Sequence, residues 1–209
     1  MVLYSYWRST TAYRARIALN LKGVEYRVES VDLVAGAQRS EVYSALNPVQ
    51  AVPSLVTEAG EVLTQSMAIL EYLEETIPDP ALLPQDPLIR ARIRAAANVI
   101  ATDIHPVNNL RVVNRIKEMG HSQDDNVAWM QHWMHKGFAA FATLAAGETP
   151  FAFGDMPGLA DICLVPQLYN AHRWGVDLSA YPRLTEIEAR CLALPEFDAA
   201  KPENQKDAA

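Results

Sequence analysis

The chain has 209 residues, and half of them are hydrophobic, so it can bury a substantial core in one large domain or two small ones. Its formal net charge is −7 at pH 7, which argues against a nucleic-acid-binding protein because such proteins usually carry a basic face. No apolar stretch is long enough to span a membrane, and the pattern of the first residues is not the one expected of a secretory signal. We expect a cytoplasmic protein without a nucleic-acid or membrane partner.

Strand and helix signals alternate over residues 1–80. The first strand is β-branched and aromatic, and a helix with apolar residues at helical spacing follows it. The same criteria predict further strands and helices in the order β-α-β-α-β-β-α, with strands at 2–7, 26–31, 52–56 and 62–63 and helices at 13–22, near 46 and from 66. This order predicts a small open sheet with helices on its faces.

Three hydroxyl side chains cluster where the first strand meets the first helix. Ser9, Thr10 and Thr11 stand at the helix N-terminus, where unpaired N–H groups and the helix dipole favour an anion. Arg14 and Arg16 follow, and we interpret them as a source of positive potential for a ligand. The turn lacks the glycines of a phosphate-binding loop, so a thiolate is the better candidate. The alternative is that Ser9 or Thr10 simply caps the helix.

Two other positions in this region could meet a ligand. Val52-Pro53 is a candidate cis peptide, which would turn the backbone N–H and C=O of Val52 outward toward a peptide-like ligand. Gln65 and Ser66 begin the last helix of the region, where a carboxylate could bind, although a simple helix cap is the alternative.

Four prolines between residues 77 and 87 predict a linker, and the pattern beyond it is helical throughout. We therefore predict a first domain at 1–80, a linker at 81–87 and an all-helical domain at 88–209. The polar end of the chain, 201–209, is expected to be frayed.

Polar residues interrupt the helical pattern near residue 105. Pro106 removes a backbone hydrogen bond and predicts a kink. His105 and Asn109 are four residues apart and share a face, while Asn108 and Arg111 share a neighbouring face. This set of side chains suits an anionic ligand, and a solvated helix face is the alternative.

The remaining candidates are weaker. Arg173 follows an apolar helix, and its charge could serve only to stabilise the helix dipole. No carboxylate or cysteine completes a metal-ligand set around the scattered histidines, so we expect no metal. The two cysteines, Cys163 and Cys191, lie in apolar helical contexts and are expected to pack in the core.

Taken together and in order, the motifs resemble the zeta class of the glutathione transferase superfamily, which includes maleylacetoacetate and maleylpyruvate isomerases. The resemblance covers nearly the whole chain, at residues 4–9, 14–19, 45–48, 52–53, 65–66, 71–75, 82–84, 159–161, 164–167, 176–178 and 181–182. The Val-Pro and Gln-Ser pairs are shared by many classes. The signature of the first helix, together with 105–106 and 108–109, is more specific.

The resemblance implies the glutathione transferase fold, with a thioredoxin-like α/β N-terminal domain and an all-α C-terminal domain, and a homodimer. It also implies a role for each matching residue. Glutathione would be contacted by Ser9, Thr10 and Thr11 at the sulfur, Gln38 at the glycyl end, Val52 and cis Pro53 at the cysteinyl backbone, Gln65 and Ser66 at the γ-glutamyl carboxylate, and His105, Asn109 and Arg111 from the helical domain. The substrate would be bound by Arg8, Asn108 and Arg173.

Two positions depart from the family pattern. The usual Ser-Ser-Cys at the first turn is Ser9-Thr10-Thr11 here, so a mechanism that needs a protein thiol at that point is in doubt. The helix near Asp161 usually begins with Thr or Ser, but here Gly158 takes that place. Asp161 can still provide the reverse half of a capping box.

The activity implied by the resemblance is a cis-to-trans isomerisation of a maleyl diketo acid in aromatic catabolism, from tyrosine or gentisate breakdown, with glutathione as a cofactor that is not consumed. Because the net charge repels a dianion, we expect a local basic pocket from Arg8, His105, Arg111 and Arg173. The alternatives are a general glutathione transferase acting on small haloacids or electrophiles, which would consume glutathione, and a glutathione-binding protein without turnover.

Overall fold

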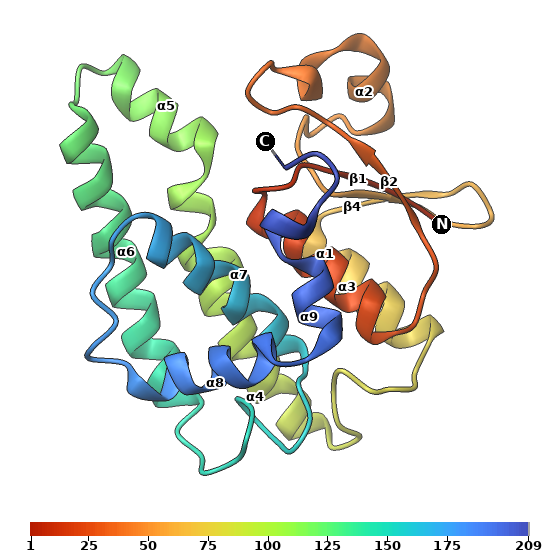
Figure 1. Ribbon diagram of the computed structural model, residues 1–209, viewed down its shortest axis with the longest axis vertical. Coiled ribbons are helices and arrows are strands. Elements are labelled where there is room, and N and C mark those ends of the chain that lie inside the picture. Colours follow the sequence, from red (N-terminus) through yellow and green to blue (C-terminus); the bar gives the residue numbers. More distant parts are fainter. Residues whose placement is uncertain (209) are drawn as a thin grey trace. The chain divides into compact units, whose positions relative to one another are not determined.

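The computed structural model describes residues 1–208, which form two compact units (Figure 1). The first unit comprises Met1–Ala81 together with the C-terminal residues from Leu192 onward. The second comprises Leu82–Cys191. None of the helices formed by residues 1–208 is long and apolar enough to cross a membrane.

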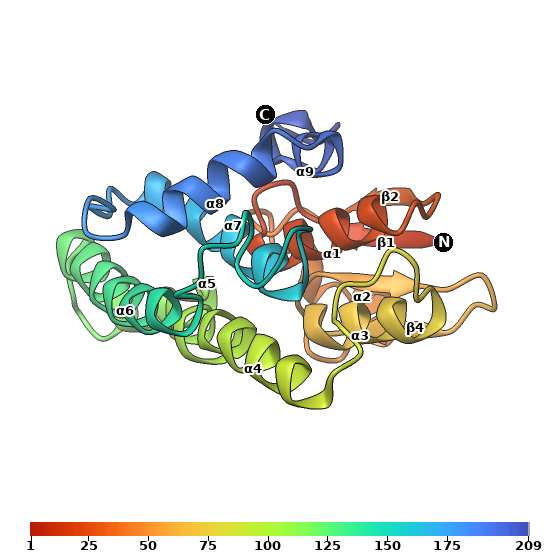
Figure 2. The same cartoon turned by 90° about the horizontal axis from the view of Figure 1, so that it is seen from below.

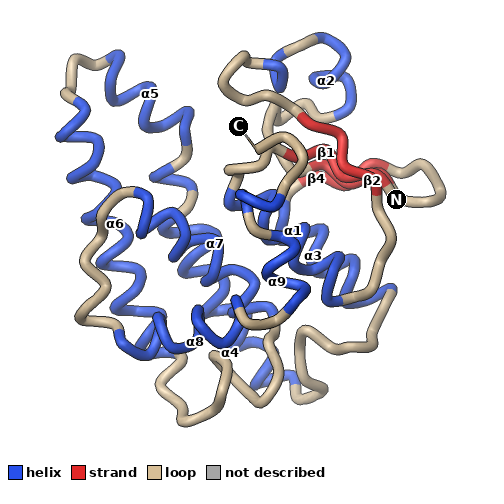
Figure 3. Tube along the Cα trace, in the orientation of Figure 1, coloured by secondary structure: helices blue, strands red, loops and turns tan. Residues whose placement is uncertain are grey.

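A four-stranded mixed sheet lies in the first unit (Figure 3). Its strands are β1 (Val2–Ser5), β2 (Arg27–Ser30), β3 (Ser54–Val56) and β4 (Val62–Thr64), in the spatial order β2-β1-β3-β4. β1 pairs parallel with β2 and antiparallel with β3, and β3 pairs antiparallel with β4. Leu3 and Leu55 are opposite each other in the β1–β3 register and are fully buried, so the centre of the sheet is part of the core.

The helices of the first unit are α1 (Thr10–Leu21), α2 (Glu41–Leu46), α3 (Ser66–Thr76) and α9 (Pro195–Ala200). Short 3-10 turns lie at Ala37–Arg39 and Pro202–Asn204. α1 packs against both α3 and α9, which explains why almost every residue of α1 is buried. Ala15 and Ala18 are fully buried, and Ala12 packs in a core cluster with Val31, Tyr43 and Val52.

The C-terminal residues differ from two expectations, one about the domain boundary and one about fraying. The domain prediction assigned residues 192–208 to the helical part, whereas their contacts are with the first unit. The side chain of Asn20 donates to the Glu196 carbonyl at 2.8 Å, and Gln205 donates to two carbonyls of the preceding turns. The expected fraying is therefore wrong for 201–208, because polar side chains satisfy backbone groups there; Ala209 lies outside the described residues.

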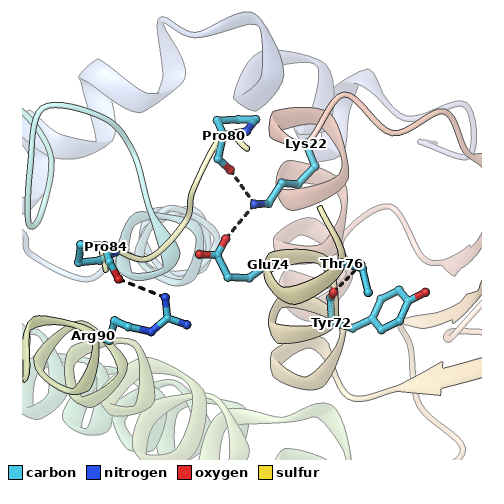
Figure 4. Close-up of polar contacts among 7 residues, drawn as sticks. All are labelled: Lys22, Tyr72, Glu74, Thr76, Pro80, Pro84 and Arg90. Atoms are coloured by element: carbon cyan, nitrogen blue, oxygen red, sulfur yellow. Dashed lines mark hydrogen bonds and ion pairs between the residues drawn. The ribbon is translucent and has the colours of Figure 1, made fainter. Parts of the chain in front are cut away.

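A buried ion pair ties α1 to the segment that follows α3 (Figure 4). The Lys22 ammonium donates to Glu74 Oε2 at 2.8 Å and to the Pro80 carbonyl at 2.6 Å. The two charged side chains are 0% and 7% exposed. A pair this deeply buried is stabilising only while both partners are present, because either charge alone carries a large desolvation cost.

The second unit contains α4 (Pro87–Asn98), α5 (Leu110–Glu118), α6 (Gln123–Leu144), α7 (Leu159–Arg173) and α8 (Pro182–Leu192), of which α4 and α6 are clear in Figure 2. A π-helical turn at Val99–Ile104 and a 3-10 turn at Pro106–Asn108 link α4 to α5. The fully buried Phe138 and Phe141 of α6 and Ile162 and Leu164 of α7 belong to its core.

The start of α7 explains why glycine stands where the family has Thr or Ser. A Cβ on Gly158 would lie 2.7 Å from the backbone oxygen of Leu82, which also accepts the Leu159 N–H at 3.0 Å. Asp161 accepts the Gly158 N–H at 2.9 Å, so the reverse half of the capping box is present as expected. Its other oxygen accepts the Ala152 N–H at 2.9 Å, while burial raises the pKa of this carboxyl to about 6.

The ion pair gives a test of how the first unit is held together. Replacing Glu74 with leucine leaves the Lys22 ammonium buried with one carbonyl acceptor, so Glu74→Leu should lower the free energy of unfolding by about 3–5 kcal/mol. The double variant Lys22→Met with Glu74→Leu should recover at least half of that loss. Urea unfolding measures the free energy of unfolding of both variants. Equal losses in the single and the double variant would contradict the role given to the ion pair.

Candidate active site

The loop between β1 and α1 is shaped by Ser9. Its backbone N–H donates to the Tyr6 carbonyl at 3.0 Å and closes a turn, and its Oγ accepts the Ala12 N–H at 3.2 Å as the N-cap of α1. The capping alternative is therefore correct for Ser9. Capping uses a lone pair of the hydroxyl, so its proton remains free to be directed elsewhere.

A chain of two hydroxyls runs from Ser9 to the peptide at position 52. Thr11 Oγ1 donates to the Val52 carbonyl at 2.9 Å, and Ser9 Oγ lies 3.0 Å from Thr11 Oγ1. Because a hydroxyl carries a single proton and that of Thr11 is directed at Val52, Ser9 is the donor in the contact between them. Thr10 is buried beside them.

The Val52-Pro53 peptide is cis, as predicted. The prediction that both polar groups of Val52 are free for a ligand is only half correct, since the carbonyl accepts from Thr11. The Val52 N–H has no hydrogen-bond partner among residues 1–208. Tyr43 Oη and Asn47 Nδ2 each donate to the Ala51 carbonyl at 2.7 Å, so the segment is held firmly from the side of α2.

The start of α3 has an unusual backbone. Gln65 has φ of 68°, a left-handed conformation that non-glycine residues rarely adopt, and it precedes the helix without a side-chain cap bond. Its side chain is exposed. Ser66 is buried, and its Oγ accepts from Arg14 Nη1 at 3.5 Å. A helix N-terminus without a side-chain cap, beside a buried guanidinium, favours an anion.

Arg14 and Arg16 do not face solvent. Both are buried in the first unit, and Arg16 donates to a hydroxyl and three carbonyls. The interpretation of Arg16 as a ligand-facing charge is therefore wrong, because its buried guanidinium donates to backbone carbonyls. Gln38, in the 3-10 turn after β2, has a buried Oε1 without a hydrogen-bond partner among residues 1–208.

In the second unit the interruption near residue 105 is a π-helical turn followed by a 3-10 turn. The His105 N–H donates to the Ile100 carbonyl at 3.0 Å, five residues back. Gly137 of α6 makes room for this turn, since a Cβ there would lie 2.3 Å from Ile104 side-chain atoms. The disruption expected at Pro106 is thus present, and π turns of this kind are frequent at functional sites.

His105 and Asn109 come together as predicted, with Asn109 Nδ2 3.5 Å from His105 Nε2. Asn109 is also the N-cap of α5 and accepts the Arg111 N–H at 3.1 Å. Asn108 and Arg111 do not share a face, because the helix is broken at Asn109. Asn108 is 8% exposed and donates to the Met130 carbonyl, whereas Arg111 is exposed.

The two arginines expected to bind substrate each lie over a neighbouring indole. In the first unit, Arg8 lies 4.6 Å from the Trp7 ring centre and donates to Tyr6 Oη at 3.3 Å. In the second, Arg173 lies 4.9 Å from the Trp174 ring centre in the exposed last turn of α7. Stacking on an indole restricts the orientation of each guanidinium.

The cysteines are both fully buried in the second unit, as expected for packing. Burial raises the pKa of the Cys191 thiol, which makes it a poor nucleophile. Among residues 1–208, no group of three or more His, Cys, Asp or Glu side chains is arranged to hold a metal ion.

Sequence patterns missed several residues that shape the site. Tyr43 and Asn47, which brace the Ala51 carbonyl, gave no local signal beyond the motif at 45–48. Asp207, which accepts the Trp7 N–H at 3.2 Å, lies 200 residues from its partner. No periodicity or spacing in one sequence connects positions so far apart.

Comparison with known proteins agrees with this architecture. The family models described as the N-terminal and C-terminal domains of glutathione S-transferase match residues 1–75 and 128–190. Maleylacetoacetate isomerase of Pseudomonas aeruginosa is 48% identical over 209 residues, covering 99% of this chain and 98% of the relative.

Two solved structures are also similar. The holo structure of maleylpyruvate isomerase, described as a bacterial glutathione transferase of the zeta class, is 44% identical with a TM-score of 0.97 and full coverage of both chains. Maleylacetoacetate isomerase from Methylobacterium extorquens AM1, with bound malonate and glutathione, is 38% identical with a TM-score of 0.95 and full coverage of both chains.

These findings confirm the predicted fold, a thioredoxin-like α/β unit followed by helices. The likeness extends over the entire length of the relatives and not over one domain alone. The chain belongs to the glutathione S-transferase family, within the zeta class of maleylacetoacetate and maleylpyruvate isomerases.

Proposed function

We propose that this protein is a glutathione-dependent cis–trans isomerase of a maleyl diketo acid, either maleylacetoacetate or maleylpyruvate. Its relatives carry these names over the full length of the chain. The observation that carries the proposal is the pair of hydroxyls at the N-terminus of α1, joined to a peptide whose N–H has no partner among residues 1–208. That arrangement suits a cysteinyl peptide, which offers both a thiol and a backbone carbonyl.

Residues of the first unit fit glutathione as a cofactor. The Val52 N–H is a donor for its cysteinyl carbonyl, and the uncapped start of α3 at Ser66 is a site for its γ-glutamyl carboxylate. The exposed Gln65 side chain lies beside that start. The Gln38 amide, with its buried Oε1, is assigned to the glycyl end. In the second unit, we assign His105, Asn109 and Arg111 to glutathione as well.

Bound glutathione supplies a thiolate that adds reversibly to an activated double bond. The protein's task is to hold negative charge at the sulfur, which the α1 dipole and the hydroxyls favour. Thr11 directs its proton to Val52, so Ser9 is the hydroxyl that turns its proton toward the sulfur when its bond to Thr11 is released. Thr11 then orients Ser9, and no protein thiol is required.

The substrate carries two carboxylates, and the net charge of −7 repels it at long range. We assign Arg8 and Arg173 to these carboxylates because each guanidinium is held over an indole, and a guanidinium donates two parallel hydrogen bonds to a carboxylate. Asn108 remains a proposed substrate contact, and its Nδ2 donates to the Met130 carbonyl.

A homodimer in the cytoplasm completes the proposal. Leu88 and Ile89 at the start of α4 are 60% and 41% exposed, and such adjacent apolar side chains favour an interface. Light scattering of the purified protein should give about twice the 23.1 kDa of one chain. A mass of one chain at micromolar concentration would contradict the dimer.

Variants of the two hydroxyls separate their roles. Removing the proton donor at the sulfur should lower kcat by about 10²–10³ in Ser9→Ala, as loss of one preorganised donor does in other enzymes. Thr11→Val has a similar shape but loses both hydrogen bonds of the hydroxyl, the one to the Val52 carbonyl and the one from Ser9, so we expect about a tenfold loss because Ser9 is no longer oriented. Steady-state kinetics measure both. A larger loss in Thr11→Val would make Thr11 the donor instead.

The reaction itself is tested by following maleylpyruvate and maleylacetoacetate absorbance with catalytic amounts of glutathione. We expect many turnovers per glutathione and no loss of free thiol. Thiol consumption with small haloacids, without isomerisation, would favour a general transferase. Glutathione binding without either reaction would leave only a binding protein.

The same assay examines substrate binding. Arg8→Ala and Arg173→Ala should each raise KM about tenfold or more, because each removes a charge-assisted pair. Matched controls are Arg27→Ala and Arg115→Ala, which remove exposed arginines paired with nearby glutamates. An unchanged KM and kcat in both test variants would remove the arginines from the mechanism.

A further inference from the structure

The turn that presents Arg8 and Ser9 is held by two side chains from outside it, those of Arg16 and Asp207. Arg16 is 0% exposed, and its guanidinium donates to the Trp7 carbonyl at 3.0 Å and to Ser5 Oγ at 3.0 Å. Its Nη1 also lies 3.5 Å from the Tyr6 carbonyl, which accepts the Ser9 N–H that closes the turn. A rigid planar fork thus fixes two successive carbonyls of this turn.

The other side of the turn is held by the C-terminal segment. Asp207 Oδ2 accepts the Trp7 N–H at 3.2 Å and the Ser30 hydroxyl at 2.8 Å. The peptide groups on both sides of Trp7 are therefore occupied, the N–H by Asp207 and the carbonyl by Arg16. Trp7 is also the residue whose indole supports the Arg8 guanidinium.

The C-terminal segment is anchored well enough to serve as a support. Arg16 Nε donates to the Ala200 carbonyl at 2.9 Å, so the same side chain holds both α9 and the turn. Gln205 Nε2 donates to the Ala199 and Lys201 carbonyls, and Asn204 Nδ2 donates to the Asp198 carbonyl. These bonds tie the residues before Asp207 back onto α9.

We propose that Asp207 and Arg16 are positioning residues of the thiol site. They hold the turn from Tyr6 to Ser9 so that the Ser9 hydroxyl and the Arg8 guanidinium keep their places, and neither touches the reacting atoms. The proposal rests on the proposed function for the identity of the ligand. It makes the C-terminal segment part of the active site's support, a role that no motif at 201–208 indicates.

Removing Asp207 should change the pKa of the bound thiol in opposite directions, depending on whether the residue acts by positioning the turn or through its charge. A carboxylate acting through its charge would disfavour a nearby thiolate, so its removal would lower the pKa of the bound thiol. A carboxylate acting through the turn keeps Ser9 in place, so its removal would raise that pKa. The sign of the change therefore identifies the role.

The experiment titrates the thiolate absorbance of glutathione bound to the wild type and to Asp207→Ala, with kcat measured alongside. We expect the variant to raise the pKa of the bound thiol by about one unit, which is a tenfold change in thiolate below the pKa, and to lower kcat about tenfold. Asp207→Asn should stay close to wild type, because its amide oxygen can accept the same two hydrogen bonds.

The matched control is Asp198→Asn, which removes the same charge from α9, where Asp198 pairs with Lys201. It should leave the thiol pKa and kcat unchanged. Thermal unfolding of each variant verifies that the fold is retained. If Asp207→Ala fails to fold, Arg16→Lys provides the second test, since it keeps the charge but loses the fork and should raise the thiol pKa likewise.

Three results would overturn the proposal. They are a lowered thiol pKa in Asp207→Ala, an unchanged one, and an Asp207→Asn variant as impaired as Asp207→Ala, which would show that the two accepted hydrogen bonds do not position the turn. The titration needs only glutathione. A protein that binds glutathione but isomerises neither maleyl acid would therefore refute the proposed function without deciding the role of Asp207.

Discussion

The hydrogen bond from Thr11 to the Val52 carbonyl is the interaction on which the proposed site depends. It joins the first turn of α1 to the segment before β3, two parts of the first unit that are 41 residues apart. By directing the only proton of Thr11, it decides that Ser9 is the donor of the pair. One bond thereby sets the direction of the hydroxyls at the helix N-terminus and occupies one polar group of the Val52 peptide.

This arrangement explains how the chain can do without the cysteine that its family usually carries at position 11. A thiol is a weak donor, whereas a threonine hydroxyl donates firmly to a carbonyl. In the proposed site, the role left to that position is to orient Ser9, and a hydroxyl can perform it. There the helix dipole and the neighbouring donors would stabilise the negative charge without a second nucleophile.

Much of the local structure was predictable because it depends on residues that are close in sequence. Ser9 caps α1, the Val52-Pro53 peptide is cis, and Asp161 accepts the N–H of Gly158. The order of strands and helices in the first unit also agrees with the periodic pattern. In each case the deciding physics acts within about four residues, at a cap, a turn or one helix face.

What was missed depends on long-range packing. The burial of Arg16 and the docking of residues 201–208 on the first unit involve partners up to 200 residues away, which a single sequence does not connect. Asn108 was assigned to a helix face that does not exist, because the chain makes π and 3-10 turns there and Gly137 accommodates them. Charge alone also led to a wrong interpretation of Arg16, because an arginine next to a turn that binds a ligand can donate to backbone carbonyls instead.

Whether this turn makes a bound thiol acidic is decided by a direct titration of the wild-type complex. Ultraviolet absorbance of the thiolate is recorded against pH for glutathione with and without the protein. The account predicts a pKa for the bound thiol at least one unit below that of a free thiol, which is about 8.5. A bound thiol that titrates like the free one would contradict it.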